Sequence, residues 1–199
     1  MYFKAVDNSL LSKDGSTLYH HQVGREISIP DGVRNILRGA CGSNIEGNRG
    51  GTVVIPASVT NIGEVAFYGR HVEKFVLSEG LESLERFAFS STTISTIRIP
   101  ASVRRIGERC FNECDNLVSI GFLGNEPQCE SLDCPSSATV YVREESLGWR
   151  NEFGQVVATW PRQAEDANHV EIWDGVTLPG EKTLPEEKLS FEEMAFLSP

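Results

Sequence analysis

The chain has 199 residues, of which 40% are hydrophobic and 9% aromatic, values that favour one folded unit over a disordered chain. Its net charge of −10 is uneven: residues 1–143 carry 14 basic and 16 acidic side chains, whereas residues 144–199 carry 4 and 12. Neither part has the basic stripe that would neutralise phosphates, which argues against nucleic acid and anionic lipid as partners.

The sequence contains no run of 18 apolar residues, so we expect no membrane insertion. The first residues lack the basic segment and apolar run of a secretory signal, and no transmembrane segment is visible. The cellular location therefore stays unknown at this point. Five cysteines are few for a disulfide scaffold and odd in number, so they do not decide the redox compartment either.

The first predicted element is a hairpin within residues 1–23. Asp14 and Gly15 stand between two runs in which apolar and polar residues alternate. This pattern is typical of a tight turn between antiparallel strands.

Four segments that follow the hairpin align with one another. They begin 26, 22 and 22 residues apart, at Ile27, Val53, Phe75 and Ile97. An apolar strand residue is followed four positions later by Val or Leu, three positions further by Ile or Leu, and then by a small residue with Cys or Phe. These last pairs are Ala40-Cys41, Ala66-Phe67, Ala88-Phe89 and Cys110-Phe111. Such a repeat predicts stacked units whose like residues form one continuous core.

Each segment opens with the alternation of a half-buried strand, as in Thr96 to Ile99. The proline that follows ends the strand because it cannot donate to a continuing ladder. The remainder is too short for a full helix and predicts turns and short pieces that return over the back. The third segment has Ser78 in place of proline and Glu85 in place of glycine. We expect these changes to loosen a turn without breaking the stack.

The segment IRIPASVRRIGERCFNEC, from Ile97 to Cys114, closely resembles the BspA-like (Treponema pallidum-type) leucine-rich repeat. VDNSLLSKDGSTLYHH looks like the segment that commonly precedes these repeats, and ATVYVREESLGWRNEF, from Ala138, resembles the strand and Trp-containing turn that end such arrays. The resemblance implies a leucine-rich-repeat solenoid, with a β-strand plus a turn or short 3₁₀ segment in each repeat of about 22–23 residues. A fifth strand is expected around Ile120 and Phe122.

Three regions follow from these patterns. Residues 1–23 form an N-terminal capping hairpin, residues 24–153 form the repeats with their C-terminal cap, and residues 154–199 form an acidic, flexible region. Residues 175–199 are rich in Pro, Glu and Lys, and we expect them to be dispensable for folding. Their pattern allows a short helix from Pro185 to Phe196.

A binding strip is predicted on the concave face, where the strand residues between the core positions point. Two adjacent strands each contribute an exposed valine to this row, although the same positions also suit solvated strand residues with no partner. The strip comprises Glu26, Ser28, Thr52, Val54, Lys74, Val76, Thr96, Arg98 and Ser119, with Gly121 beside the last.

Two motifs have a structural and a chemical interpretation. Residues 42–49 have the glycine spacing of a phosphate-binding loop, but Asn48-Arg49 stand where Lys-Ser/Thr is needed, so an insertion loop is favoured and no cofactor is expected. The cysteines favour buried core thiols. A disulfide between Cys129 and Cys134, or a metal site, remains the alternative.

No catalytic constellation is visible around the histidines at positions 20, 21, 71 and 169, and the acidic pairs near the C-terminus predict a solvated face. We therefore expect a non-catalytic protein-binding module. The resemblance implies adhesion or recognition at a cell surface, with a host-matrix or cell-surface protein as partner. The competing hypothesis is an intracellular scaffold that uses the repeats or the acidic tail. No nucleic acid and no metal are expected as ligands.

Overall fold

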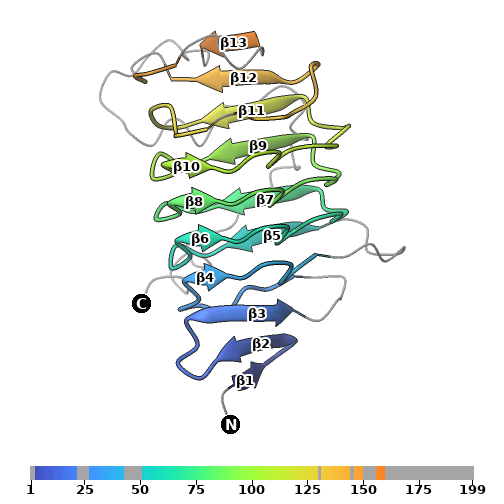
Figure 1. Ribbon diagram of the computed structural model, residues 1–199, viewed down its shortest axis with the longest axis vertical. Coiled ribbons are helices and arrows are strands. Elements are labelled where there is room, and N and C mark those ends of the chain that lie inside the picture. Colours follow the sequence, from blue (N-terminus) through green and yellow to red (C-terminus); the bar gives the residue numbers. More distant parts are fainter. Residues whose placement is uncertain are drawn as a thin grey trace, which may run out of the picture.

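The computed structural model describes residues 3–21, 27–42, 51–129, 131–143, 146–149 and 156–159, the last range by its backbone alone. The regular secondary structure of these ranges consists of β-strands, which are stacked along one long axis (Figure 1). Within this part of the chain, no helix is present that would be long and apolar enough to cross a membrane. The fold is a β-solenoid.

The long strands follow one another through the stack in chain order, and neighbouring strands are parallel. β9 lies beside β7, although the two belong to separate hydrogen-bonded sheets (Figure 1). The predicted order of parallel strands is therefore confirmed. The long strands are β5 (Thr52–Ile55), β7 (Lys74–Leu77), β9 (Thr96–Ile99), β11 (Ser119–Phe122), β12 (Thr139–Val142) and β13 (Val156–Thr159).

Both ends of this ladder differ from the prediction. At the first level, the strand expected at Ile27–Ile29 is reduced to one parallel bridge between Ser28 and Val54. At the other end, β13 continues the ladder beyond residue 153 and pairs in parallel with β12. The sequence analysis missed β13 because its four residues carry none of the downstream repeat motif, although Val156 and Val157 are typical strand formers.

A second ladder is made by two-residue strands, at positions where only turns and short pieces were predicted. All four are parallel, and each lies one level above the preceding one. Turns follow them, and no 3₁₀ segment occurs among the described residues. The short strands are β4 (Asn35–Ile36), β6 (Asn61–Ile62), β8 (Ser83–Leu84) and β10 (Arg105–Ile106).

The predicted N-terminal hairpin is present and extends the short-strand ladder. β1 (Phe3–Val6) pairs antiparallel with β2 (Ser9–Ser12), which pairs antiparallel with β3 (Thr17–His21). β3 in turn lies parallel to β4, so the hairpin closes the first level of the solenoid. Its turn uses Gly15 at a φ of 82°, a conformation that glycine adopts without steric cost.

Repeated side chains form a continuous core between the two ladders. The rings of Phe67, Phe89 and Phe111 stack with centroids 5.6 and 5.9 Å apart. Phe75 of β7 packs edge-on against Phe67 at 5.0 Å and against Phe89 at 4.7 Å. Because one repeat buries its apolar side only against its neighbours, this column joins consecutive levels into one unit.

The turns also repeat from level to level. One position in each turn has a positive φ, with 64° at Gly39, 50° at Val65, 57° at Phe87 and 56° at Arg109. The third level keeps the ladder despite its altered residues, because the Glu85 amide donates to the Ile62 carbonyl at 2.9 Å. This agrees with the expectation that Glu85 does not break the stack.

Candidate binding surface

The outward-facing residues of the long strands form the surface on which binding was predicted. Successive strand residues point to opposite faces, so the buried Val53 and Ile55 of β5 alternate with the exposed Thr52 and Val54. Parallel pairing then places like positions of neighbouring levels side by side.

Four predicted residues are exposed and adjacent on the N-terminal half of this surface. Val54 is 52% exposed and pairs with Val76 of β7, which is 37% exposed. Ser28 bridges to Val54 from the level below, and Thr52 lies two residues away on the same face of β5. We call Ser28, Thr52, Val54 and Val76 the open strip.

Lys74 and Arg98 are half-buried, and both already take part in contacts within the protein. Lys74 pairs with Thr52 across β5 and β7. Both were predicted as members of the binding strip, and the structure shows them half-buried rather than fully exposed. Glu26, the remaining charged member of the predicted strip, lies outside the described residues.

Thr96 and Ser119 are wrongly placed in the predicted strip. Thr96 of β9 is 5% exposed and Ser119 of β11 is 0% exposed. Ser119 pairs with Thr96, and Gly121 pairs with Arg98. Gly121 is buried as well. The alternation along the strand predicted which way these residues point, but an outward direction is not the same as contact with solvent.

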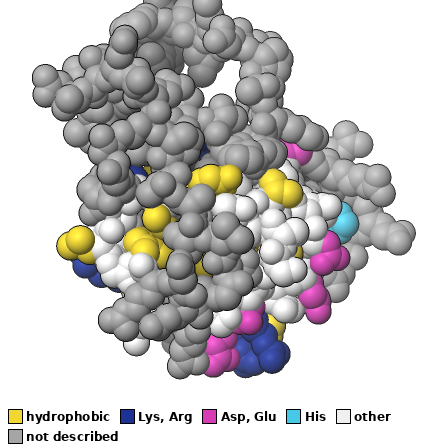
Figure 2. Space-filling view, turned by 90° about the horizontal axis from the view of Figure 1, so that it is seen from above, with side chains coloured by type: hydrophobic (Ala, Val, Ile, Leu, Met, Phe, Trp, Pro, Cys, Tyr) yellow, Lys and Arg dark blue, Asp and Glu magenta, His cyan; other side chains and the backbone are white. Residues whose placement is uncertain are grey.

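A second surface, along the short-strand side, carries ion pairs that the sequence analysis did not single out. Arg38 and Glu64 lie 3.7 Å apart, and Arg86 and Glu108, at the same repeat position two levels on, also lie 3.7 Å apart. Figure 2, viewed along the stack, shows acidic and basic side chains side by side at one edge. The sequence pattern that could have revealed these ion pairs is the alternation of arginine and glutamate at one position of the four aligned repeats, from Arg38 to Glu108.

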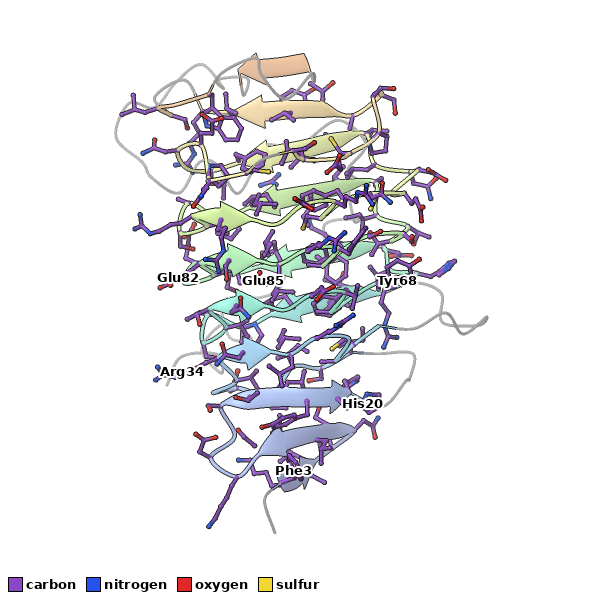
Figure 3. The ribbon with its side chains drawn as sticks, in the orientation of Figure 1. Phe3, His20, Arg34, Tyr68, Glu82 and Glu85 are labelled. Atoms are coloured by element: carbon purple, nitrogen blue, oxygen red, sulfur yellow. The ribbon has the colours of Figure 1, made fainter. Side chains whose placement is uncertain are left out.

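These ion pairs are partly exposed, so each contributes about 0–1 kcal/mol to the free energy of unfolding. Glu85 additionally accepts a hydrogen bond from Arg105 Nη2 at 2.9 Å. Glu82 lies at the opposite edge of the molecule from Tyr68, and Glu85 lies between them (Figure 3). On this surface Glu64, Glu85 and Glu108 each face an arginine.

The cysteines are free thiols. Cys41, Cys110 and Cys114 are fully buried in the core, as the repeat predicts. Burial raises the pKa of Cys41 to about 12 and also raises the pKa values of Cys110 and Cys114. Cys129 and Cys134 form no disulfide, and burial raises the pKa of each to about 11. At neutral pH these thiols are therefore protonated, which disfavours nucleophilic attack and metal ligation.

One Ser-His pair occurs in the hairpin, where Ser9 Oγ lies 3.0 Å from His21 Nδ1. Both residues are buried, so the pair joins β2 to β3 and is not open to a substrate. The glycine-spaced loop lies outside the described residues beyond Gly42. The tail with its acidic pairs, including the helix allowed from residue 185, also lies outside them.

A family comparison matches the central part of the chain. Residues 49–133 match the sequence model described as "BspA type Leucine rich repeat region", in six copies. The first of the four aligned segments, which starts at Ile27, precedes the matched range. No curated protein matches the chain.

A comparison with solved structures also gave matches. The pneumococcal vaccine antigen PcpA is 14% identical, with 79% of this chain and 47% of PcpA covered and a TM-score of 0.42. A leucine rich cell surface protein from Faecalibacterium prausnitzii is 14% identical. The match covers 73% of this chain and 71% of that protein, with a TM-score of 0.36. A leucine-rich repeat protein from Bacteroides ovatus is 15% identical. The match covers 78% of this chain and 50% of that protein, with a TM-score of 0.37. The chain thus spans about half the length of the first and third structures.

Proposed function

Residues 49–133 of this chain are a BspA-type leucine-rich-repeat region, and on that premise we propose a non-catalytic, protein-binding module that serves adhesion or recognition at a cell surface. Solenoids of stacked repeats offer an extended surface whose side chains are not needed for the core, and protein binding is the usual use of such a surface. The surface role is the one that the family resemblance implies.

The observation that carries the binding proposal is the open strip. Val54 and Val76 are apolar, exposed and directly paired across β5 and β7. Ser28 and Thr52 border them with small polar groups. A partner that covers the two valines removes apolar surface from water, while the hydroxyl groups offer hydrogen bonds at the margin.

The chemistry of the described residues supports a non-catalytic role. Their thiols are kept protonated by burial, and the Ser9–His21 pair is enclosed in the hairpin. An acid, base or nucleophile must reach its substrate, and the thiols of Cys41, Cys110 and Cys114 and the Ser9–His21 pair are buried away from the surface.

The test is a double variant, Val54→Asp with Val76→Asp, in the full chain. Because both side chains point to solvent, the variant should fold normally and lose binding to the partner. Val118→Asp is the matched control, since Val118 is 40% exposed just before β11 and outside the open strip. A substitution that reverses the charge of Lys74 or Arg98 is a less suitable test, because it would also change the contacts that these side chains already make within the protein.

Two binding assays separate the surface role from the intracellular scaffold. In one, the protein is applied to immobilised host extracellular matrix; in the other, it is incubated with a lysate of its source cells. Matrix binding that the double variant loses and Val118→Asp keeps supports the proposal. Binding that the double variant retains in both assays contradicts the open strip as the site. Cleavage of the protein by protease added to intact source cells tests the location independently.

A further inference from the structure

The outward face of the long strands is shielded from solvent at the levels of β9 and β11. Ser119 is 0% exposed and Thr96 is 5% exposed, although the alternation along each strand points both side chains away from the core. Gly121 is buried beside them, and the Nε atom of Arg98 is shielded as well. Because the long Arg98 side chain leaves the sheet on its outward side, shielding of Nε requires a layer of atoms over this face.

The described strands do not supply this layer. β9 packs against β7 and β11, and β11 packs against β9 and β12, so these neighbours extend the same surface and do not cover it. The short-strand ladder lies on the other side of the core. The shielding is present in a single chain, so the cover belongs to this chain and not to a second copy.

Outside the described residues, one long segment begins beside the covered levels. Residues 22–26 and 43–50 adjoin β3 and β5, at the end of the stack where the outward face is open. Residues 150–155 connect Trp149, which packs against the core, to the start of β13. Residues 160–199 follow directly after β13, which continues the ladder of β9, β11 and β12 (Figure 1). We call residues 160–199 the C-terminal segment.

The C-terminal segment is long enough to reach the shielded levels. β13, β12, β11 and β9 are successive strands, so β9 lies three strand spacings of about 4.8 Å from β13. An extended residue spans roughly 3.3 Å. A few residues after Thr159 therefore cross this distance, and the remainder can cover several levels.

The face and the C-terminal segment have opposite charges. The described outward positions of β7, β9, β11 and β12 include Lys74 and Arg98 and no carboxylate, and Arg143 follows directly after β12. The C-terminal segment carries nine acidic and three basic side chains. Lys74, Arg98 and Arg143 all take part in contacts within the protein. Opposite charges attract more strongly where water is excluded, as it is at Arg98 Nε.

We propose that the C-terminal segment docks on the outward face of β9 and β11 and closes this half of the face to protein partners. The open strip is then the part of the face that the segment leaves uncovered, which accounts for the fall in exposure beyond Val76. The segment covers the solenoid from outside the core, so its removal should leave the solenoid folded. This docking is independent of whether the open strip binds a partner.

The experiment measures how fast an introduced thiol reacts with N-ethylmaleimide in the full chain. Ser119→Cys reports on the covered level, and Thr52→Cys is the matched control at an exposed position of the same face. Peptide mass spectrometry separates each introduced thiol from the native cysteines. We expect the Ser119→Cys thiol to react more slowly by about tenfold or more, because the segment must first lift away.

Removal of the C-terminal segment should expose the site. In a chain that ends at Thr159, reaction of the Ser119→Cys thiol should accelerate by about tenfold or more, whereas reaction of the Thr52→Cys thiol should not change. Cys110 is an internal control for folding, because it is fully buried and should stay unreactive. If Cys110 reacts, the deletion has unfolded the solenoid, and a full-length variant then decides the question.

That full-length variant carries amides in place of the nine acidic side chains of the C-terminal segment, so the solenoid sequence is unchanged. The loss of charge should weaken docking and accelerate reaction of the Ser119→Cys thiol. Equal rates for Ser119→Cys and Thr52→Cys in the intact chain would overturn the proposal. Continued protection of Ser119→Cys in a shortened chain whose Cys110 stays unreactive would also overturn it. Where the shortened chain does not fold, continued protection in the amide variant has the same consequence.

Discussion

The inward-facing and outward-facing columns of the long strands behave differently, although both repeat with the same spacing. Val53, Phe75, Ile97 and Ile120 are buried at every level. Across the outward column, exposure falls from 52% at Val54 to 37% at Val76, Arg98 is half-buried, and Gly121 is buried.

The pair Thr52 and Thr96 makes the difference clearest. Both are threonines at the first position of their strands, in equivalent places of the repeat. Thr52 is exposed, whereas Thr96 is buried. A repeat therefore determines the direction of a side chain, whereas its contact with solvent depends on what else in the fold covers that level.

The largest expected effect is on the inward side. Phe89 contacts three aromatic rings, those of Phe67, Phe75 and Phe111, so Phe89→Ala should lower the free energy of unfolding by roughly 3–5 kcal/mol. Denaturant unfolding monitored by circular dichroism measures the loss. A loss below about 1 kcal/mol would mean that the column is not a continuous core.

The outward side is tested by introducing a lysine at a buried position and, in a second variant, at an exposed position, and comparing the two losses of stability. Ser119→Lys introduces a charge at a fully buried site and should cost about 2–3 kcal/mol. Thr52→Lys, at an exposed site, should change stability by no more than about 0.5 kcal/mol. Equal effects in denaturant unfolding would remove the distinction between the two halves of the surface.

The turns offer a smaller, stabilising change. Val65 has a φ of 50°, which is strained for a β-branched residue, whereas Gly39 has the equivalent place one level below. Val65→Gly should therefore raise the free energy of unfolding by about 1 kcal/mol. Val65→Ala is the control, because it keeps Cβ and should gain less. If the two variants have the same thermal midpoint, strain at this turn is not the cause.

The smallest effect is expected in the hairpin turn. Hydrogen bonds from Ser12 and Ser16 lower the pKa of Asp14 to about 2, from an ordinary value of 3.8. The folded state thus favours the carboxylate, so its contribution to stability is complete above pH 3.8 and is lost as the pH falls through about 2. Asp14→Asn should reduce the difference in stability between pH 5 and pH 2. Parallel curves for the two proteins would show that Asp14 is not responsible.

Much of the fold could be predicted because it depends on spacing within one repeat. The alternation at Ile97 and Ile99 predicts a strand, and the Phe67, Phe89 and Phe111 column predicts the stacked core. The short strands were missed because two residues are too few to display a period. β13 was missed because its pairing with β12 is a contact between levels and leaves no motif in the chain.

The candidate surface was predicted less completely. Val54 and Val76 are exposed as expected, whereas Thr96 and Ser119 are buried. The binding of a protein partner to this surface stays a prediction. The region boundary at residues 153 and 154 also stays a prediction, with β13 beyond it. The shielding of Arg98 Nε from solvent was not predicted either.

The sequence by itself determined the period, the direction of the strand side chains and the identity of the core columns, because these depend on residues that are neighbours in the chain or one repeat apart. Only the tertiary structure decided which half of the outward face is open, which charges are paired, and that the Nε atom of Arg98 is shielded from solvent. The physical reason is that burial is a property of all the atoms surrounding a site. Many of those atoms belong to residues whose positions no local pattern reports.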